Sequence, residues 1–316
     1  MRRIKHFVSI TDLTKKEINL VLQISSSLKR QLKKKGSNKD YLKNKVLGMI
    51  FEKPSLRTRV SFEAGMTQMG GHAIYLAPGD IDLGKREPVK DVSQVLSRMV
   101  DIIMARTFLH TTIEELAKYS SVPVINALSE QEHPCQILAD LLTIKEKKGK
   151  LKGIKLAFVG DGENNVTHSL ALASAIFGMD FRVATPPGFE MQSIILEKAK
   201  AIASKSGGLI IETDKPEEAV KGVDIVYTDT WVSMGDESEK DKRIKAFKGY
   251  QVNTRLMNFA KKDAIFMHDM PAYRGYEVSE EVIEGKQSII INQAENRLHV
   301  QKGLICFLLR TTINTS

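Results

Sequence analysis

Short apolar runs alternate with amphipathic segments along this chain of 316 residues, and this alternation limits the possible folds more than any other feature. A strand buried in a parallel sheet is a short continuous apolar run, whereas the helix that follows it has one polar side. Regular exchange of the two patterns is typical of α/β proteins, in which helices cover a mostly parallel sheet. The sequence therefore predicts an α/β fold.

The alternation occurs twice, on either side of the breaker-rich segment 148–150. We expect two doubly wound parallel sheets joined by a long helix, and in such folds ligands bind beyond the carboxyl ends of the strands. The expected strands of the first half are Val46–Phe51, Ala73–Leu76, Asp101–Ala105 and Val122–Ala127, and its helices are Ser55–Met69, Val92–Met99 and Pro134–Lys147. The expected strands of the second half are Ile154–Val159, Phe181–Ala184, Leu209–Glu212, Asp224–Thr228, Ala264–Met267 and Ile289–Ile291, and its helices are Asn164–Phe177, Gln192–Ser206 and Ala294–Leu309.

Composition and charge narrow the classes of function. The chain has no apolar run of about 18 residues and no secretory signal pattern, so we expect no membrane partner. Two cysteines without a metal-binding spacing favour free thiols in a cytoplasmic protein, and no metal or cofactor is expected. The net charge is +9, and the basic residues are spread along the chain apart from one short cluster at Lys29–Lys35. We interpret this cluster as a solvated helix end. With only 6% aromatic residues, we expect no nucleic-acid partner, and the charge would serve solubility and attract a small anion.

A candidate phosphate site follows the first expected strand. Ser55 is a good N-cap, and the free N–H groups of a helix start attract anions. Arg57, Thr58 and Arg59 add positive charge and a hydroxyl donor within the same turn. A capped helix with surface arginines explains these residues equally well, so the segment alone leaves both interpretations open.

Further motifs give the segment a family context. S-x-R-T-R after F-E-K-P resembles the phosphate-binding signature of the aspartate/ornithine carbamoyltransferase family, and the resemblance covers nearly the whole chain. The motifs that carry it, in order, are Ser55–Arg59, Arg106, His133-Pro134-Cys135-Gln136, Gly160-Asp161 with Asn164-Asn165, Asp229–Gly235, His268-x-x-Pro271-Ala272 and Gln293–Arg297.

The resemblance implies a first substrate and its ligands. Residues 1–148, with a C-terminal helix 294–316 returning to them, would bind carbamoyl phosphate, and Arg106, His133 and Thr58 would donate to the carbonyl oxygen that gains charge during attack. Gln136 would hold the carbamoyl nitrogen, and Arg297, at the start of the last helix, would be a further ligand rather than the partner of Glu295. The full set that the resemblance assigns to carbamoyl phosphate is Ser55, Leu56, Arg57, Thr58, Asp82, Arg106, His133, Pro134, Cys135, Gln136, Asp269, Met270 and Arg297.

The resemblance also implies an acceptor. Residues 149–293 would bind L-ornithine, with Asp229 on the α-ammonium group, Asn165 at the α-amino-acid end, and Ser233 and Met234 in the S-M-G segment of ornithine-using members. The products would be L-citrulline and phosphate, in the setting of arginine biosynthesis. Catalytic roles would fall to Arg106, His133, Gln136, Asp269 and Arg297. The resemblance further implies that the chain assembles into a homotrimer or a multiple of it.

Three positions depart from the family pattern. Leu56 replaces the usual threonine, and Asp82 aligns with a glutamine that reaches the neighbouring subunit in relatives. Asp269 stands in the place of the cysteine of His-Cys-Leu-Pro, and its carboxylate could either accept from the side-chain ammonium of ornithine or alter the choice of acceptor. Two alternatives therefore stay open: a carbamoyltransferase for another amine, such as putrescine or an acylated ornithine, and a binding relative without turnover.

Overall fold

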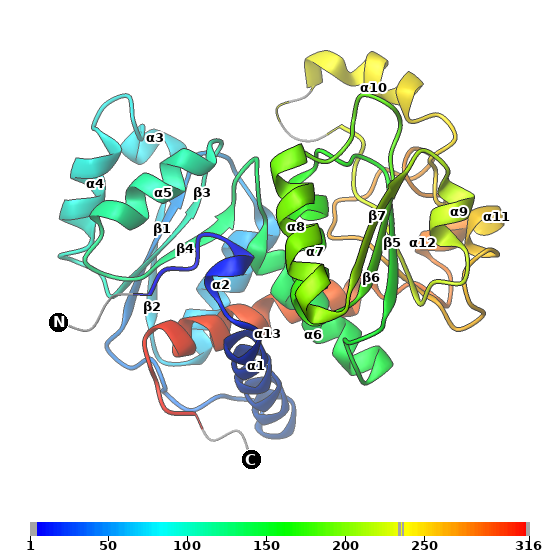
Figure 1. The fold of residues 1–316 in the computed structure, drawn as a ribbon. Coiled ribbons are helices and arrows are strands. Elements are labelled where there is room, and N and C mark those ends of the chain that lie inside the picture. The colour runs from blue at the N-terminus through cyan, green and yellow to red at the C-terminus, as the bar shows by residue number, and fades with distance from the viewer. Residues whose placement is uncertain (1–4, 233–234, 236, 314–316) are drawn as a thin grey trace. The chain divides into compact units, whose positions relative to one another are not determined.

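The structure is a computed structural model that describes residues 5–232, 235 and 237–313. Its contacts divide the chain into two compact units (Figure 1). Unit 1 comprises Met1–Leu142 and Glu295–Ser316, and unit 2 comprises Thr143–Ala294. Each unit contains one parallel sheet, so the predicted α/β class is confirmed. The functional domain bounds given above, 1–148 with 294–316 and 149–293, stay a prediction.

Unit 1 is built on four parallel strands in the order β2-β1-β3-β4. These strands are β1 (Val46–Phe51), β2 (His72–Leu76), β3 (Ile102–Arg106) and β4 (Val124–Leu128). Side chains of β1, β3 and β4 form a core with apolar residues of α4 (Val89–Leu96) and α5 (His110–Tyr119). The unit also contains η1 (Ile10–Asp12), α2 (Leu56–Gln68) and α3 (Pro78–Ile81), while α6 (Pro134–Lys148) begins here and ends in unit 2.

The last helix, α13 (Ile290–Leu308), packs on α1 (Lys15–Lys35), as the sequence predicts for a returning C-terminal helix. Gly303 lies at a close approach of the two helices. A Cβ atom at Gly303 would lie 2.1 Å from the Ser25 Oγ and 2.9 Å from the Val21 carbonyl oxygen. Glycine is therefore required at this position for α13 to reach unit 1.

Two lysines of unit 1 are buried with neutral partners. The Lys29 Nζ donates to the Asn296 Oδ1 at 2.7 Å, and the Lys302 Nζ donates to the side-chain oxygens of Asn38 and Gln68 at 2.8 Å each. Burial lowers the pKa of Lys302 to about 8. The prediction that the whole Lys29–Lys35 cluster is solvated is therefore wrong for its first member, which lies on the buried face of α1.

Unit 2 is built on five parallel strands in the order β7-β6-β5-β8-β9. These are β5 (Lys155–Val159), β6 (Asp180–Ala184), β7 (Leu209–Thr213), β8 (Ile225–Tyr227) and β9 (Ile265–Met267). Helices α7 (Asn165–Phe177) and α8 (Ser193–Ser206) pack against each other. The remaining helices are α9 (Pro216–Val220), η2 (Glu237–Glu239), α10 (Lys240–Ala246), α11 (Thr254–Met257) and α12 (Glu280–Ile283).

The predicted strand Ile289–Ile291 is wrong. The backbone pairs with β9 only around Ser288, through one isolated bridge to Phe266, and α13 begins at Ile290. A run of three isoleucines has the composition of a buried strand, but here it forms the end of that bridge and the first turn of a helix. Arg297 consequently lies in the second turn of α13 and does not open it.

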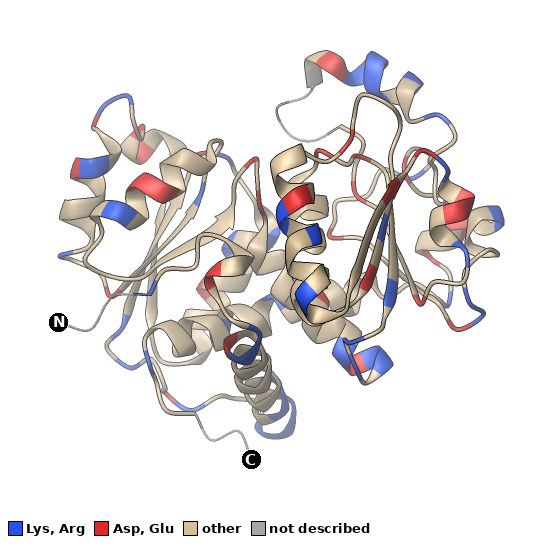
Figure 2. Cartoon of the chain, in the orientation of Figure 1, with Lys and Arg blue, Asp and Glu red and all other residues tan. Residues whose placement is uncertain are grey.

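The charges are interspersed rather than gathered. Figure 2 shows Lys and Arg alternating with Asp and Glu along elements of both units. None of the helices in the described ranges combines the length and apolar character that crossing a membrane demands.

Candidate functional site

In unit 1, the turn between β1 and α2 presents a helix start. The Ser55 Oγ accepts the Thr58 backbone N–H at 3.4 Å, which caps α2 as predicted. Leu56 is the first residue of the helix, and its side chain is 74% exposed, so only its backbone can serve a ligand at this turn. Arg57 follows and is half-buried. The free N–H groups of this first turn suit an anion.

Two arginines meet at the buried Thr58 hydroxyl. The Arg297 Nη2 donates to the Thr58 Oγ1 at 2.7 Å, and the Arg106 Nη1 donates to it at 3.5 Å. The Ser55 Oγ lies 3.0 Å from the same atom. Arg106 ends β3, while Arg297 comes from α13, so the return of the last helix is what brings the second guanidinium to this hydroxyl.

His133 is buried one residue before α6, among these cations. Burial, and then the positive charges of Arg297, Arg106, Lys53 and Arg57, hold the pKa of His133 well below its usual value. The ring is therefore neutral near pH 7 and can donate one N–H without adding charge. The sequence interpretation missed Lys53, which is buried with its Nζ 5.0 Å from the Phe108 ring centroid.

The first turn of α6 places Gln136 beside a carboxylate. The Gln136 Nε2 donates to the Asp140 Oδ1 at 3.0 Å, and within the described residues the buried Gln136 Oε1 has no hydrogen-bond partner. Pro134 is the first residue of this helix, where its missing N–H is of no consequence. The Cys135 thiol donates to the Asn126 carbonyl oxygen, and burial raises its pKa to about 12, so the thiol stays protonated near pH 7.

Asp82, another residue predicted to bind carbamoyl phosphate, lies in a different environment from the buried residues described above. It is exposed at the C-cap of α3 with a left-handed φ of 50°, and its carbonyl oxygen accepts the N–H groups of Lys85 and Arg86. Its assignment to carbamoyl phosphate stays a prediction.

In unit 2, polar residues follow the three neighbouring strands β5, β8 and β9. Asn164 caps α7 after β5, and its Nδ2 donates to the Asp229 Oδ2 at 2.7 Å. Asp229 follows β8, and its Oδ1 accepts the Thr230 N–H at 2.7 Å. The sequence interpretation named Asn165, which is half-buried, but it missed the direct bond of Asn164 to Asp229.

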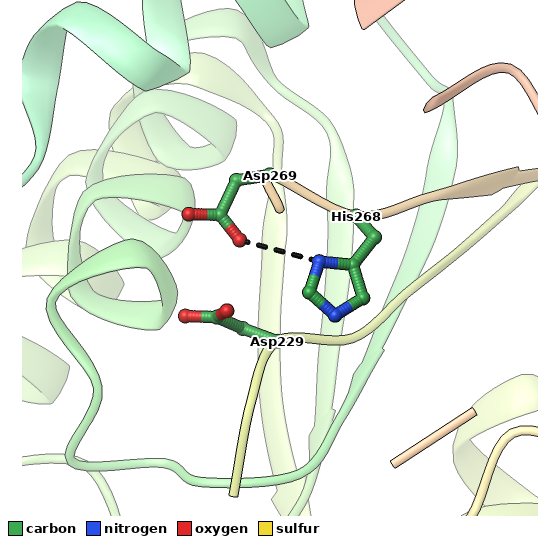
Figure 3. Close-up of side chains that lie close together, drawn as sticks. All are labelled: Asp229, His268 and Asp269. Carbon is green, nitrogen blue, oxygen red and sulfur yellow. Dashed lines mark ion pairs between the residues drawn. The ribbon is translucent and has the colours of Figure 1, made fainter. Parts of the chain in front are cut away.

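Asp229, His268 and Asp269 converge in this unit, and one ligand atom of each lies within 4.8 Å of the others (Figure 3). The His268 Nδ1 lies 3.5 Å from the Asp269 Oδ1. Burial, and then the charge of Asp269, raises the pKa of Asp229 well above its usual value. Met270, another predicted ligand, is half-buried, packs against the core of unit 2 and donates its N–H to the His268 Nδ1 at 2.9 Å.

His268 is fully buried, and its partners fix its ring. Its Nε2 lies 3.3 Å from the Oε1 of buried Glu277. Burial opposes protonation, but the hydrogen bonds to Asp269 and Glu277 raise the pKa of His268 to about 9. Nδ1 lies near the Met270 N–H and the Asp269 carboxylate, and Nε2 faces Glu277. Both nitrogens thus have protein partners, which makes the cluster a better acceptor for an ammonium group than a histidine-ligated metal site.

A buried ion pair anchors the loop that follows Asp229. The Arg243 Nη1 donates to the Asp161 Oδ2 at 2.7 Å and to the Trp231 carbonyl oxygen at 3.3 Å. Burial raises the pKa of Asp161 to about 6 in spite of this partner. Trp231 itself stacks on Phe247 at 5.8 Å between ring centroids. The predicted ligands at positions 233 and 234, Ser233 and Met234, lie outside the described residues.

Comparison with known proteins assigns both units to one family. The family described as aspartate/ornithine carbamoyltransferase matches residues 5–146 with its carbamoyl-P binding domain and residues 152–308 with its Asp/Orn binding domain. The ornithine carbamoyltransferases of Caldicellulosiruptor saccharolyticus and Methanosarcina acetivorans are 51% and 54% identical to the chain, covering 96% of it and 98% of each relative.

Solved structures agree with this assignment. The ornithine carbamoyltransferase from Pyrococcus furiosus has a TM-score of 0.94 and 46% identity, with 98% of each chain covered. The anabolic ornithine carbamoyltransferase from Campylobacter jejuni has a TM-score of 0.91 and 46% identity, covering 98% of this chain and all of its own.

Proposed function

Because the chain belongs to the aspartate/ornithine carbamoyltransferase family, we propose that it transfers the carbamoyl group of carbamoyl phosphate to the side-chain amine of L-ornithine. The products are L-citrulline and phosphate. The observation that carries this function is the Thr58 hydroxyl held by two arginines beside a neutral, buried histidine. That arrangement suits a reaction in which a carbonyl oxygen gains negative charge.

The phosphate end of the first substrate fits the start of α2. The backbone N–H groups after Ser55 and the guanidinium of Arg57 offer charge-assisted hydrogen bonds to phosphate oxygens. The same donors stabilise the phosphate as it leaves. Because the phosphate is the leaving group, no covalent intermediate with the protein is needed.

The carbamoyl end fits the deeper donors. The Thr58 Oγ1 accepts from Arg297 and Arg106, which leaves its own proton to donate to the carbonyl oxygen together with the N–H of His133. The Gln136 Oε1, whose amide nitrogen is already bonded to Asp140, is a suitable acceptor for the carbamoyl N–H group. Donors and acceptor fixed in this way require little reorganisation as charge develops.

The amine fits the acidic cluster of unit 2. Asp229 and the neighbouring Asn165 would bind the amino-acid end of ornithine, because a carboxylate is the natural complement of an ammonium group. The side-chain amine has a pKa near that of lysine, about 10, so it must lose a proton before it attacks the carbonyl carbon. A buried acidic acceptor such as Asp269 can receive that proton.

The test is a citrulline assay with three acceptors: ornithine, putrescine and N-acetylornithine. We expect ornithine to be used by far the most efficiently. Preference for putrescine or N-acetylornithine would make that amine the proposed acceptor. We would expect such a preference if Asp269 changes the choice of acceptor. Carbamoyl phosphate binding without carbamoyl transfer to any of the three would contradict the proposed activity.

Two further expectations accompany the activity. The resemblance implies a homotrimer or a multiple of it, and a monomeric mass by light scattering in an active preparation would contradict that assembly. We also propose a cytoplasmic location, supported by the two buried cysteines, which are free thiols.

A further inference from the structure

We propose that Asp229 and Asp269 form a carboxyl pair that shares one proton in the free protein and exchanges this proton for the α-ammonium group of the acceptor. This inference rests on the proposed function, since it takes an amino acid as the second substrate. It assigns to Asp269, the residue that departs from the family pattern, a part in binding the amine rather than an isolated contact.

The geometry brings the two carboxyl groups together. Asp229 follows β8 and Asp269 follows β9, and these strands are neighbours in the sheet. Figure 3 shows the two carboxyl groups stacked on the same side of His268. One carboxylate oxygen of each residue lies within 4.8 Å of the other, and two buried carboxyl groups this close are more stable when one of them keeps a proton.

The surroundings limit where that proton can go. Asp229 is 7% exposed, and the Asp269 side chain is 11% exposed, so water does little to separate their charges. Among the residues that the structure describes, His268 faces the pair and in turn faces Glu277. Asn164 and the Thr230 N–H donate to Asp229 and stabilise its carboxylate form. The shared proton therefore belongs to the pair and not to either residue alone.

An ammonium group can take the place of the proton. Hydrogen bonds from an ammonium to a carboxylate are about 2.7–2.9 Å long, so one nitrogen can contact two oxygens that lie within 4.8 Å of each other. The exchange conserves charge: the pair carries −1 with its proton and, with both carboxyl groups ionised around a +1 ammonium, the net charge is again −1. The displaced proton leaves to solvent.

L-Norvaline isolates this step, because it keeps the α-amino-acid end of ornithine and lacks the side-chain amine. It cannot be carbamoylated, so its binding can be measured by calorimetry with carbamoyl phosphate present. Since the proposed exchange binds norvaline in its ammonium form, a proton that the wild type releases and Asp269→Asn does not comes from the carboxyl pair. Titration near pH 7, in buffers of different ionisation enthalpy, should show release approaching one proton for each norvaline bound by the wild type. Its affinity should rise by up to about tenfold per pH unit while the pair holds its proton.

The matched variants are Asp269→Asn and Asp269→Cys, which leave Asp229 without an acidic partner. Both should release fewer protons than the wild type near pH 7, since removal of the Asp269 charge lowers the pKa of Asp229, whose carboxylate form Asn164 and the Thr230 N–H stabilise. Wild-type binding without proton release, equal release in wild type and Asp269→Asn, or no norvaline binding at all would overturn the proposal. The citrulline assay is independent of these titrations, so a failure of the proposed function can be told apart from a failure of the pair.

Discussion

The two units present clusters of opposite charge at the carboxyl ends of similar parallel sheets. Unit 1 gathers Arg106, Arg297 and Lys53 around a hydroxyl and a neutral histidine. Unit 2 gathers Asp229, Asp269 and Glu277 around an imidazole. Both clusters are largely buried, so their charges are weakly screened and each would favour a ligand of the opposite sign.

This difference shows that the fold sets where a ligand binds, while the residues at the strand ends set which ligand it is. The three departures from the family pattern lie in both units, at Leu56 and Asp82 in unit 1 and at Asp269 in unit 2. Leu56 and Asp82 are exposed, whereas Asp269 lies in the acidic cluster, where the resemblance implies a thiol. The predictions below test this difference between the two units.

The largest expected effect comes from breaking the buried ion pair between Arg243 and Asp161, which anchors the loop that follows Asp229. Arg243→Met leaves the Asp161 carboxylate buried without its cation, which should lower the free energy of unfolding by about 3–5 kcal/mol. It also frees the Trp231 carbonyl and should raise the KM for ornithine with little change in that for carbamoyl phosphate. Urea unfolding and steady-state kinetics measure the two effects.

A double variant supplies the control for this ion pair. Asp161→Asn combined with Arg243→Met removes both charges, so it should recover part of the stability that Arg243→Met loses, with a coupling that a double-mutant cycle resolves. Additive losses of unfolding free energy, or a selective rise in the KM for carbamoyl phosphate, would mean that the ion pair does not support the loop that follows Asp229.

The next effect concerns the carbonyl donors of unit 1. Arg106→Ala should lower kcat by about 100- to 1000-fold, the range typical of removing one donor to a developing oxyanion. Exposed Arg98, in the turn before β3, is the matched control, and Arg98→Ala should leave kcat within about twofold of wild type. Citrulline formation, followed by rapid quench or in the steady state, gives kcat for both variants. Equal kcat values would mean that Arg106 takes no part in the chemical step.

Most of the fold could be predicted because strands and helices have different apolar periods. Every predicted strand except Ile289–Ile291 overlaps a strand of the structure, and the N-cap of α2 lies at Ser55 as expected. The sequence analysis gave no range for α1, α5, α3 or the short helices of unit 2, although α1 and α5 have clear apolar faces. Lys29 could have been found on the buried face of α1, because it follows Ser25 by four residues.

The site was less predictable, because its partners are far apart in the chain. Asp161 and Arg243 are separated by 82 residues, and no local pattern links them. Glu277 looks like a surface glutamate in an acidic stretch, yet it is fully buried against His268. Residues supplied by a recurring motif, such as Thr58, could be named from the sequence, whereas those that orient them required the structure.

A smaller effect is expected when the family residue is restored. Asp269→Cys should keep ornithine activity within about tenfold of wild type, because a thiol near its ordinary pKa of about 8.5 is neutral at pH 7 and leaves Asp229 to bind the ammonium group alone. Comparison of kcat/KM for ornithine across pH gives the measurement. The wild-type rise with pH due to the shared proton should move to lower pH in the variant, and superimposable profiles would show that Asp269 is structural.

The central claim is that unit 1 binds carbamoyl phosphate and unit 2 binds ornithine. It is tested most directly by measuring the KM for each substrate in two variants, with the other substrate saturating. Removing Arg57, half-buried at the start of α2, should weaken carbamoyl phosphate binding about tenfold or more, since a charge-assisted hydrogen bond contributes about 1.5–3 kcal/mol. Arg59→Ala is its control, because the structure pairs this exposed arginine with Glu63 at 3.0 Å although the sequence places it in the same turn as Arg57. We predict that Arg57→Ala raises the KM for carbamoyl phosphate alone and that Asp229→Asn raises the KM for ornithine alone. Equal losses for both substrates in either variant would contradict the account.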